Sequence, residues 1–594
     1  MKLDKETIIV LSICFVLLII WPYLFSVPKQ PQPETQPQNI ESKGKAAPSD
    51  SSISPAGANG KELKKPEPVN KEPLRTEEIK KDASVQKTEK TGKSEDEIKL
   101  PEIPDQIISN DCISFKINPA GGYVSSIEFK KFLTTDKKKT ITLNEDFDPG
   151  ALSFSTAGKL KTTSLECLKE NENTLKVTRG FRNEAGRDFT VVQTWKILEK
   201  YKTDYRIQII NSSKEKLSVD GIRVSAGSII PVLELSGDYF MMETHCISTC
   251  LENTVASKSA SADKPFEELQ ENAASWIAVS NKYFACILKP ETPFKKGEGN
   301  VLRQIIKTMK DEKGKEKSYS SIETYGVIEK IELEPASEAS LGFTYFSGPK
   351  ELALVKEFDP KASEIMYLGW AWFEPISQGF LVALIWLKKF CGSYGLSIIL
   401  LTFIVKMIFW PVTDRANASM RKMQKIQPLV QEIKTKYKDD SQKMNQKIMQ
   451  LYKEHKVNPL GGCLPILLQI PVFTALYFSL NGAIELRQSS FLWAFDLSRP
   501  DTIYTIPGIE LAINPLVILM AVTMVYQQHL TPSAMDPMQQ KMMMIMPLVM
   551  LVLLYSLPSG LTLYWTISQG ISIVQLLVNK RIDEKEKSLE KKNA

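Results

Sequence analysis

The sequence predicts a polytopic α-helical membrane protein that carries an all-β domain outside the cytoplasm. Long apolar runs crowd the two ends of the 594-residue chain. Residues 28–104 are instead rich in Pro, Lys, Glu, Ser and Gln, and residues 105–357 alternate apolar and polar side chains as β-strands do. A chain of this length should hold more than one domain, and these changes in composition mark the boundaries.

Residues 1–27 are predicted to be a cytoplasmic tip and a membrane anchor. The apolar run 8–25 is long enough to cross a bilayer. Lys2 and Lys5 precede it, and Trp21 and Tyr23 stand at its far end, where interfacial aromatic residues belong. No small-residue cleavage site follows, so we expect an uncleaved anchor rather than a signal peptide.

Residues 28–104 are predicted to be a disordered tether, because they lack the apolar surface needed to offset ordering entropy. Residues 105–357 should then form an antiparallel β-sandwich outside the cytoplasm. Phe189 to Ile197 and Tyr205 to Ile209 show the period-two pattern, 281–288 is a further strand-like run, and Gly121-Gly122, Asn211-Ser212 and Gly348-Pro349 are turn signals.

Residues 358–392 should return the chain to the membrane surface. Apolar residues recur at helical spacing within 372–390: Phe373, Ile376, Phe380, Leu384 and Leu387. Glu374 and the pair Lys388-Lys389 make this segment an amphipathic helix that lies in the interface. A further membrane span is the alternative interpretation.

The helical core is assigned to residues 393–580 and begins with the apolar run 395–412, which contains Lys406. A lysine in the bilayer interior costs about 2.5–3.5 kcal/mol on insertion scales. Thr402 lies one helical turn earlier on the same face. The two residues indicate either a polar site within the membrane or a lysine that reaches the interface by snorkelling.

Residues 414–458 should form a cytoplasmic helical hairpin, because basic residues are concentrated there and apolar residues recur at helical spacing. The break is expected near Asp439-Asp440, and a solvated charged loop is the alternative. Four apolar runs follow, at 463–480, 514–530, 542–557 and 561–578. Together with the first two they predict six spans, a tail at 581–594, and both termini in the cytoplasm.

Other functional classes have little support in the sequence. The net charge of +6 is modest, and no basic patch interleaved with aromatic residues indicates direct nucleic-acid readout. His245, Cys246 and Cys250 would be three metal ligands without a clear fourth, so a disulfide or free thiols are favoured over a metal site. No phosphate loop, nucleophile elbow or paired carboxylates indicate an enzyme, and we expect no cofactor.

The order and motifs of the core resemble those of the YidC family of membrane protein insertases, in its Gram-negative form with a large periplasmic domain. The resemblance rests on Thr402 with a basic residue at 406, on NPLGGCLPILLQIPVFTALY at 458–477 and on PSGLTLYWTISQ at 558–569. It covers about 360–580 well and is weaker in the β domain. The family usually has Arg at the position of Lys406 and often has Tyr at that of Trp565.

The resemblance implies a polar groove among five helices, open to the cytoplasm and to lipid. It also implies that nascent membrane proteins enter this groove and leave sideways into the bilayer. The residues assigned to the groove are Lys406, Thr402, Gln469, Thr523, Gln527, Thr562, Trp565, Thr566 and Gln569. Those assigned to client or ribosome contact are Arg421, Lys422, Lys425, Met535, Met538 and Met542.

The implied partners are nascent chains, the ribosome, the phospholipid bilayer and the Sec translocon (SecYEG and SecDF). Two other functional classes are alternatives. An ion- or proton-coupled transporter using Lys406 would need intramembrane acids or inverted repeats, which the core spans lack. An anchored sugar-binding or scaffold protein would leave the polar faces of the core spans unexplained.

Overall fold

The computed structural model describes residues 100–593, apart from gaps at 135–136, 145–149, 230–245, 251–254, 260–266, 271–272, 296–299, 311–315, 371–372, 456, 458–463, 507–510 and 532–536. The expected anchor at 8–25 lies outside the described residues, as does nearly all of the tether expected at 28–104. The expectations for these segments therefore stay predictions.

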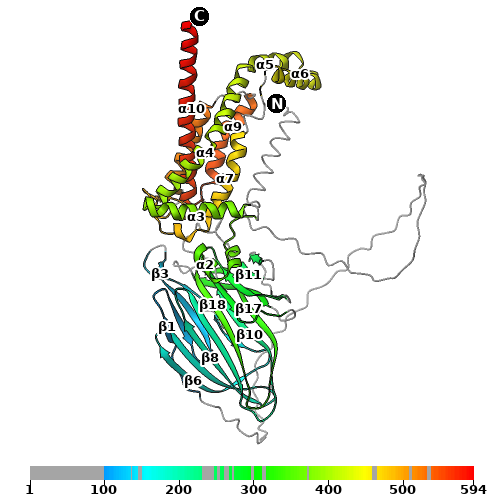
Figure 1. The fold of residues 1–594 in the computed structure, drawn as a ribbon, viewed down its shortest axis with the longest axis vertical. Helices are drawn as coiled ribbons and strands as arrows, with labels where there is room; N and C mark the ends of the chain where they lie inside the picture. The colour runs from blue at the N-terminus through cyan, green and yellow to red at the C-terminus, as the bar shows by residue number, and fades with distance from the viewer. Residues whose placement is uncertain are drawn as a thin grey trace, which may run out of the picture. The chain divides into compact units, whose positions relative to one another are not determined.

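The first part of the described chain is a β domain (Figure 1). Its strands are β1 (Gln106–Ser109), β2 (Ile113–Asn118), β3 (Tyr123–Leu133), β4 (Thr140–Leu143), β5 (Phe154–Ser155), β6 (Lys161–Asn171), β7 (Thr174–Arg182), β8 (Asp188–Ile197), β9 (Lys202–Asn211), β10 (Leu217–Ile229), β11 (Cys246–Cys250), β12 (Val255–Ser259), β13 (Glu267–Gln270), β14 (Trp276–Ser280), β15 (Phe284–Pro290), β16 (Asn300–Lys310), β17 (Glu316–Leu333) and β18 (Glu338–Pro349).

These strands form antiparallel sheets whose apolar sides share one core. The largest sheet has the order β12-β11-β14-β15-β18-β9-β8-β7-β6, and a second has the order β13-β16-β17-β10-β5. Strands β1 to β4 form a further sheet in sequence order. Phe129 of β3 stacks on Phe284 of β15 with ring centroids 4.6 Å apart, which joins two sheets across the core. The predicted antiparallel sandwich is confirmed.

The alternation read from the sequence explains why these strands form. In β9, Tyr205, Ile207 and Ile209 are fully buried while Arg206 is exposed, as expected for a strand with one face on the core. In β15 nearly every residue is buried, because this strand is covered on both faces. Gly348-Pro349, expected to be a turn, are instead the last two residues of β18 and pair with β15.

The positions of Cys246 and Cys250 in β11 decide whether these two cysteines can form a disulfide with each other. Cys246 and Cys250 occupy the two ends of a five-residue strand. Four steps of about 3.3 Å separate their Cα atoms by roughly 13 Å, whereas a disulfide needs less than about 7 Å. The two residues therefore cannot pair with each other in this fold.

The rest of the chain is helical. Its elements are α2 (Leu352–Phe358), η1 (Pro360–Met366), α3 (Glu374–Cys391), α4 (Tyr394–Lys425), α5 (Gln427–Lys436), α6 (Ser441–Glu454), α7 (Leu464–Asn481), η3 (Ile484–Leu486), β19 (Tyr504–Ile506), β20 (Leu511–Ile513), α8 (Pro515–Leu530), α9 (Pro537–Leu553) and α10 (Ser559–Asn593). Helices α4, α7, α8, α9 and α10 pack into one bundle, and α3 packs against α4 and α7.

Helix α3 has the two-sided character expected of the segment 372–390. Leu381, Leu384 and Leu387 are buried, and the hydroxyl of Ser479 in α7 donates to the carbonyl of Ser377 at 2.8 Å. Trp386 and Phe390 of the opposite side are exposed. Ile376, which the helical spacing assigns to the apolar face, is also exposed.

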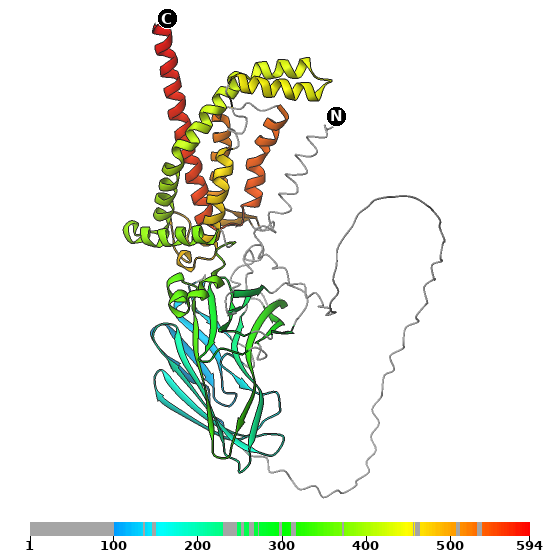
Figure 2. The ribbon, with the colours of Figure 1, turned by 45° about the vertical axis from the view of Figure 1, so that its right-hand side comes forward.

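Helix α4 does not end where the apolar run ends. The sequence suggests a span at 395–412 followed by a separate cytoplasmic segment from 414, but α4 is one helix of 32 residues with Pro411 inside it. At 1.5 Å per residue it is about 48 Å long. The expected break near Asp439-Asp440 does fall between α5 and α6, which form the helical pair that follows α4 (Figure 2).

The described residues contain two helices that are long and apolar enough to cross a membrane, at residues 394–425 and 559–582. The apolar helices at 515–530 and 543–553 are shorter. Helix α7 coincides with the apolar run at 463–480, although the run begins outside the described residues. Helices thus occupy most of each of the four later runs, while the number of spans stays a prediction.

Candidate functional site

Lys406 lies where helices α4, α7 and α10 meet. Its Nζ donates to the hydroxyl of Ser572 on α10 at 3.0 Å and to Oε1 of Gln469 on α7 at 3.4 Å. Both acceptors are neutral, so these hydrogen bonds hold the ammonium without cancelling its charge. The side chain is half-buried. Lys406 and Gln469, both assigned to the groove, are thus hydrogen-bonded to each other, while their role in a groove stays a prediction.

Gln469 extends this arrangement toward Tyr564. Its Nε2 donates to the hydroxyl of Tyr564, which is itself buried on α10. The amide can thus accept from Lys406 through its oxygen and donate to the tyrosine through its nitrogen, and this fixes its orientation. Tyr564, Gln469, Lys406 and Ser572 form one hydrogen-bonded chain across three helices, which we call the lysine network.

A second set of polar contacts joins α4 and α10 beyond Lys406. Nε2 of Gln575 donates to the hydroxyl of Thr413 at 3.1 Å. One turn further, Nδ2 of Asn579 donates to Oδ1 of Asp414 at 2.6 Å. Ser572, Gln575 and Asn579 stand at i, i+3 and i+7, so one face of α10 presents all three to α4.

The hydroxyl groups of the threonines assigned to the groove donate hydrogen bonds to backbone carbonyls of their own helices. Thr402 donates to the carbonyl of Ile398 at 2.6 Å, and Thr566 donates to that of Thr562 at 2.8 Å. Thr562 and Thr523 make the same type of bond to carbonyls three residues back. Such bonds satisfy the donor while leaving the hydroxyl oxygen able to accept. None of these bonds joins a threonine to Lys406.

The other predicted groove residues occupy several environments. Trp565 packs edge-on against Phe473 of α7 with ring centroids 4.6 Å apart, and its Nε1 is buried without a hydrogen-bond partner among the described residues. Gln569 on α10 and Gln527 on α8 are half-buried. Within the described part of the chain, no hydrogen bond connects either glutamine to Lys406.

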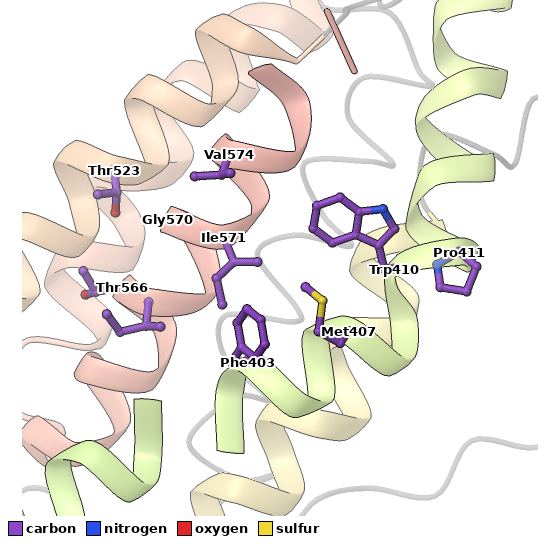
Figure 3. Close-up of a pocket in the computed structure, with 10 residues that line it drawn as sticks. Phe403, Met407, Trp410, Pro411, Thr523, Thr566, Gly570, Ile571 and Val574 are labelled. Atoms are coloured by element: carbon purple, nitrogen blue, oxygen red, sulfur yellow. The ribbon is translucent and has the colours of Figure 1, made fainter. Parts of the chain in front are cut away.

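A cavity lies beside the lysine network, between α4, α8 and α10 (Figure 3). Its volume is about 940 Å³. The lining is mostly apolar and comprises Phe403, Met407, Trp410, Pro411, Thr523, Thr566, Ile567, Gly570, Ile571 and Val574. Two of the predicted groove residues, Thr523 and Thr566, therefore line one cavity, whereas Lys406 is held on the neighbouring side of α4.

The residues assigned to client or ribosome contact are only partly described. Arg421, Lys422 and Lys425 all lie in the last turns of α4, and the two lysines are exposed. Met535 lies outside the described residues, and Met538 and Met542 belong to α9 with side chains that the structure does not describe. The predicted contact surface stays a prediction.

Two members of the lysine network were missed in the sequence. Tyr564 was not assigned to the groove, although it lies within the motif at 558–569. Ser572 was passed over although it continues the stripe of Trp565 and Gln569 at i+7 and i+3. The stripe Tyr564, Ser568 and Ser572, spaced by four residues, was the available signal.

Known proteins resemble this chain over its β domain and its core. Residues 106–380 match the family described as the YidC periplasmic domain, and residues 386–587 match the 60Kd inner membrane protein family. The membrane protein insertase YidC of Pelobacter propionicus is 32% identical over 482 residues, which are 78% of this chain and 84% of the relative. The chain belongs to the YidC family.

Other YidC relatives agree. The membrane protein insertase YidC of Syntrophobacter fumaroxidans is 34% identical over 440 residues, covering 73% of this chain and 71% of the relative. The YidC of Geobacter metallireducens is 44% identical over 252 residues, which are 42% of this chain. The β domain described above is thus a YidC periplasmic domain, and the bundle that holds the lysine network is the inner-membrane part.

Proposed function

We propose that this protein inserts nascent membrane proteins by receiving them beside the lysine network and releasing them sideways into lipid. The observation that carries the proposal is Lys406, a cation bound by a hydroxyl and an amide and placed next to a largely apolar cavity. The family membership supports the same function. No covalent step and no cofactor is part of the proposal.

The chemistry of the site fits a segment with two unlike parts. An entering chain has an apolar stretch, which the cavity of phenylalanine, methionine, isoleucine and valine can accept. It also has a polar tail that must pass the apolar layer, and acidic residues in that tail are attracted by a cation. At an effective dielectric near 20, two unit charges about 4 Å apart attract by about 4 kcal/mol, before screening and desolvation reduce this value.

The proposed topology places six spans in the inner membrane, with residues about 28–370 in the periplasm and both termini in the cytoplasm. The basic residues of 414–458 favour that side for the α5–α6 pair. Clients would arrive there from the ribosome, on the surface formed by Arg421, Lys422, Lys425 and the methionines at 535, 538 and 542. Cooperation with the Sec translocon is part of the proposal.

The test compares clients that differ only in the Asp and Glu content of their translocated tails. Purified variants are reconstituted at equal abundance in liposomes, and insertion yield is measured. We expect Lys406→Arg to resemble the wild type, Lys406→Gln to impair acidic tails more than neutral ones, and Lys406→Glu to be worst. Lys389→Gln, which removes an exposed lysine of α3, is the matched control.

A snorkelling lysine predicts a different outcome. It would need only its apolar stem and an interfacial head group, so Lys406→Gln would then be silent for every tail. Equal yields for the Arg, Gln and Glu variants across all tails would overturn the charge-based mechanism.

A further inference from the structure

The segment 487–506, part of the connection between α7 and α8, buries charged side chains and exposes large apolar ones. We call it the outer loop. Arg499 and Asp501 are buried, with exposed fractions of 6% and 4%. Leu492 and Phe495 are exposed by 71% and 76%. A loop in water normally shows the opposite distribution.

Hydrogen bonds hold the charged groups of the outer loop inward. Oδ2 of Asp501 accepts from Nε1 of Trp493 at 2.8 Å and from the backbone N–H of Leu516, in the first turn of α8, at 2.6 Å. Oδ1 of Asp496 accepts from both the backbone N–H and the hydroxyl of Ser498. The carboxylates are therefore committed to the loop and to the start of α8.

The outer loop is also fastened to the ends of two other helices. The backbone N–H groups of Ser559 and Gly560, which begin α10, donate to the carbonyls of Arg499 and Leu497 at 2.6 and 2.9 Å. At the start of α4, the ring of Phe491 fills the space that a Cβ on Gly395 would occupy. The loop is thus a fixed part of the bundle, level with the first turns of α4, α8 and α10.

The tip of the loop is built to project its apolar side chains. Phe491 and Ala494 exchange backbone hydrogen bonds at 2.8 and 3.0 Å, which makes a tight turn. Leu492 within that turn has φ 53°, a left-handed conformation that is uncommon for a leucine. Leu492 and Phe495 therefore stand out from a rigid base, while Trp493 is exposed by 38% and its indole N–H is held by Asp501.

The order of elements along the chain shows at which end of the bundle this tip lies. Helix α3 ends at Cys391, three residues before α4 begins at Tyr394. The exposed Trp386 and Phe390 of α3 therefore lie near the same end of α4 that Phe491 covers. This end follows directly from the periplasmic domain in sequence, so both apolar surfaces are on the periplasmic side.

We propose that the tip 492–495 of the outer loop is embedded in the periplasmic leaflet, at the boundary between phospholipid head groups and acyl chains. Leucine and phenylalanine suit the acyl side of this boundary, and tryptophan suits the boundary itself. A protein-binding surface would present a polar rim around its apolar centre, whereas the charges of this loop point inward. The inference rests on the proposed topology, in which α7 and α8 are spans.

The test places the photoreactive residue p-benzoylphenylalanine at position 495, and separately at 492, in the full-length protein. The protein is reconstituted in vesicles of phosphatidylethanolamine and phosphatidylglycerol, irradiated, and analysed by mass spectrometry. Leu168 on β6 of the β domain, exposed by 60%, is the matched control position. We expect phospholipid adducts at 492 and 495 that exceed those at 168 at least fivefold.

Two results would overturn the proposal. One is a lipid adduct yield at 492 and 495 equal to that at 168. The other is irradiation of intact cells that joins these positions to a protein instead of lipid. The same experiment on the Lys406→Gln variant separates this proposal from the proposed function, because lipid adducts should form whether or not insertion occurs.

Discussion

The ammonium of Lys406 on α4 lies 3.0 Å from the hydroxyl of Ser572 on α10. This contact ties the position of the cation to a helix that contributes Thr566, Ile571 and Val574 to the neighbouring cavity. The charge and the apolar surface of the candidate site are therefore held by the same pair of helices.

Replacing Ser572 should test how far the position of the cation matters. Ser572→Ala removes one acceptor, and the loss of such a hydrogen bond costs about 1 kcal/mol, which is about fivefold in an equilibrium. We expect insertion of acidic-tail clients to fall about two- to fivefold, with neutral-tail clients less affected. Insertion yield in liposomes is the measurement.

Two further variants decide whether Ser572 acts through Lys406. Ser572→Thr keeps the hydroxyl and should retain most activity. In a Lys406→Gln background, Ser572→Ala should add little, because the group that it positions is already gone. Independent, additive losses would show that Ser572 has another role.

Glu485 of η3 should make stability depend on pH. It lies outside the helical spans, its Oε2 has no hydrogen-bond partner among the described residues, and burial raises its pKa from 4.5 to about 7. The folded state thus binds this proton more tightly than the unfolded state. Its contribution is most favourable below about pH 4.5 and is lost as the pH rises to about 7.

The variant Glu485→Gln should remove this dependence. At pH 8 we expect it to be more stable than the wild type by up to about 3 kcal/mol, and at pH 4.5 nearly equal. Melting temperatures in detergent at the two pH values measure the difference. Glu338→Gln, at an exposed carboxylate of β18, should leave it unchanged; a Glu485→Gln variant that is less stable at pH 8 would refute the assignment.

The β domain should be dispensable for insertion. Its strands β1 to β18 fold around one core, to which α2, η1 and η3 add a few side chains, so removing 106–349 as a unit is cleaner than a partial deletion within 110–340. We expect insertion within about twofold of the wild type. A deletion that continues through α3 should abolish it, since α3 packs on α4 and α7. Complete loss with the first deletion, in a stably integrated protein, would contradict the prediction.

Gly395 should be sensitive to a single methyl group. A Cβ there would overlap the ring of Phe491, which seats the outer loop on α4. We expect Gly395→Ala to lower stability by about 1–3 kcal/mol, seen as a lower melting temperature in detergent. Phe491→Leu should restore part of it in the double variant. Gly379→Ala is the control, because a Cβ at Gly379 meets no neighbour within 4 Å.

The sequence predicted the β domain well because a strand's burial follows its own alternation. Tyr205, Ile207 and Ile209 needed no knowledge of their partners to be placed in the core. Sheet order did not follow, since it joins strands as distant as β5 and β10 or β9 and β18. Such pairings depend on packing between sheets, which has no local signature.

The candidate site was predicted less completely for a different reason. Helical spacing shows which residues share a face but not which helix that face meets. Thr566 lines the cavity, while Ser572 and Gln575, further along α10, meet α4. Thr402 was expected beside Lys406, yet its proton goes to Ile398 of its own helix, a bond that short hydroxyl side chains can always make within a helix.

Because α4 is one continuous helix, it can transmit motion along its length. Lys406 lies 12 residues from its start, and its last turns lead directly into the α5–α6 pair. Only Ile426 separates α4 from α5, so a tilt of the α5–α6 pair is expected to displace the cation and change its distance from Ser572. Helix α4 can bend at Pro411, because the proline ring removes a backbone hydrogen bond. A displacement of the α5–α6 pair would then act on a charge about 28 Å away along the helix.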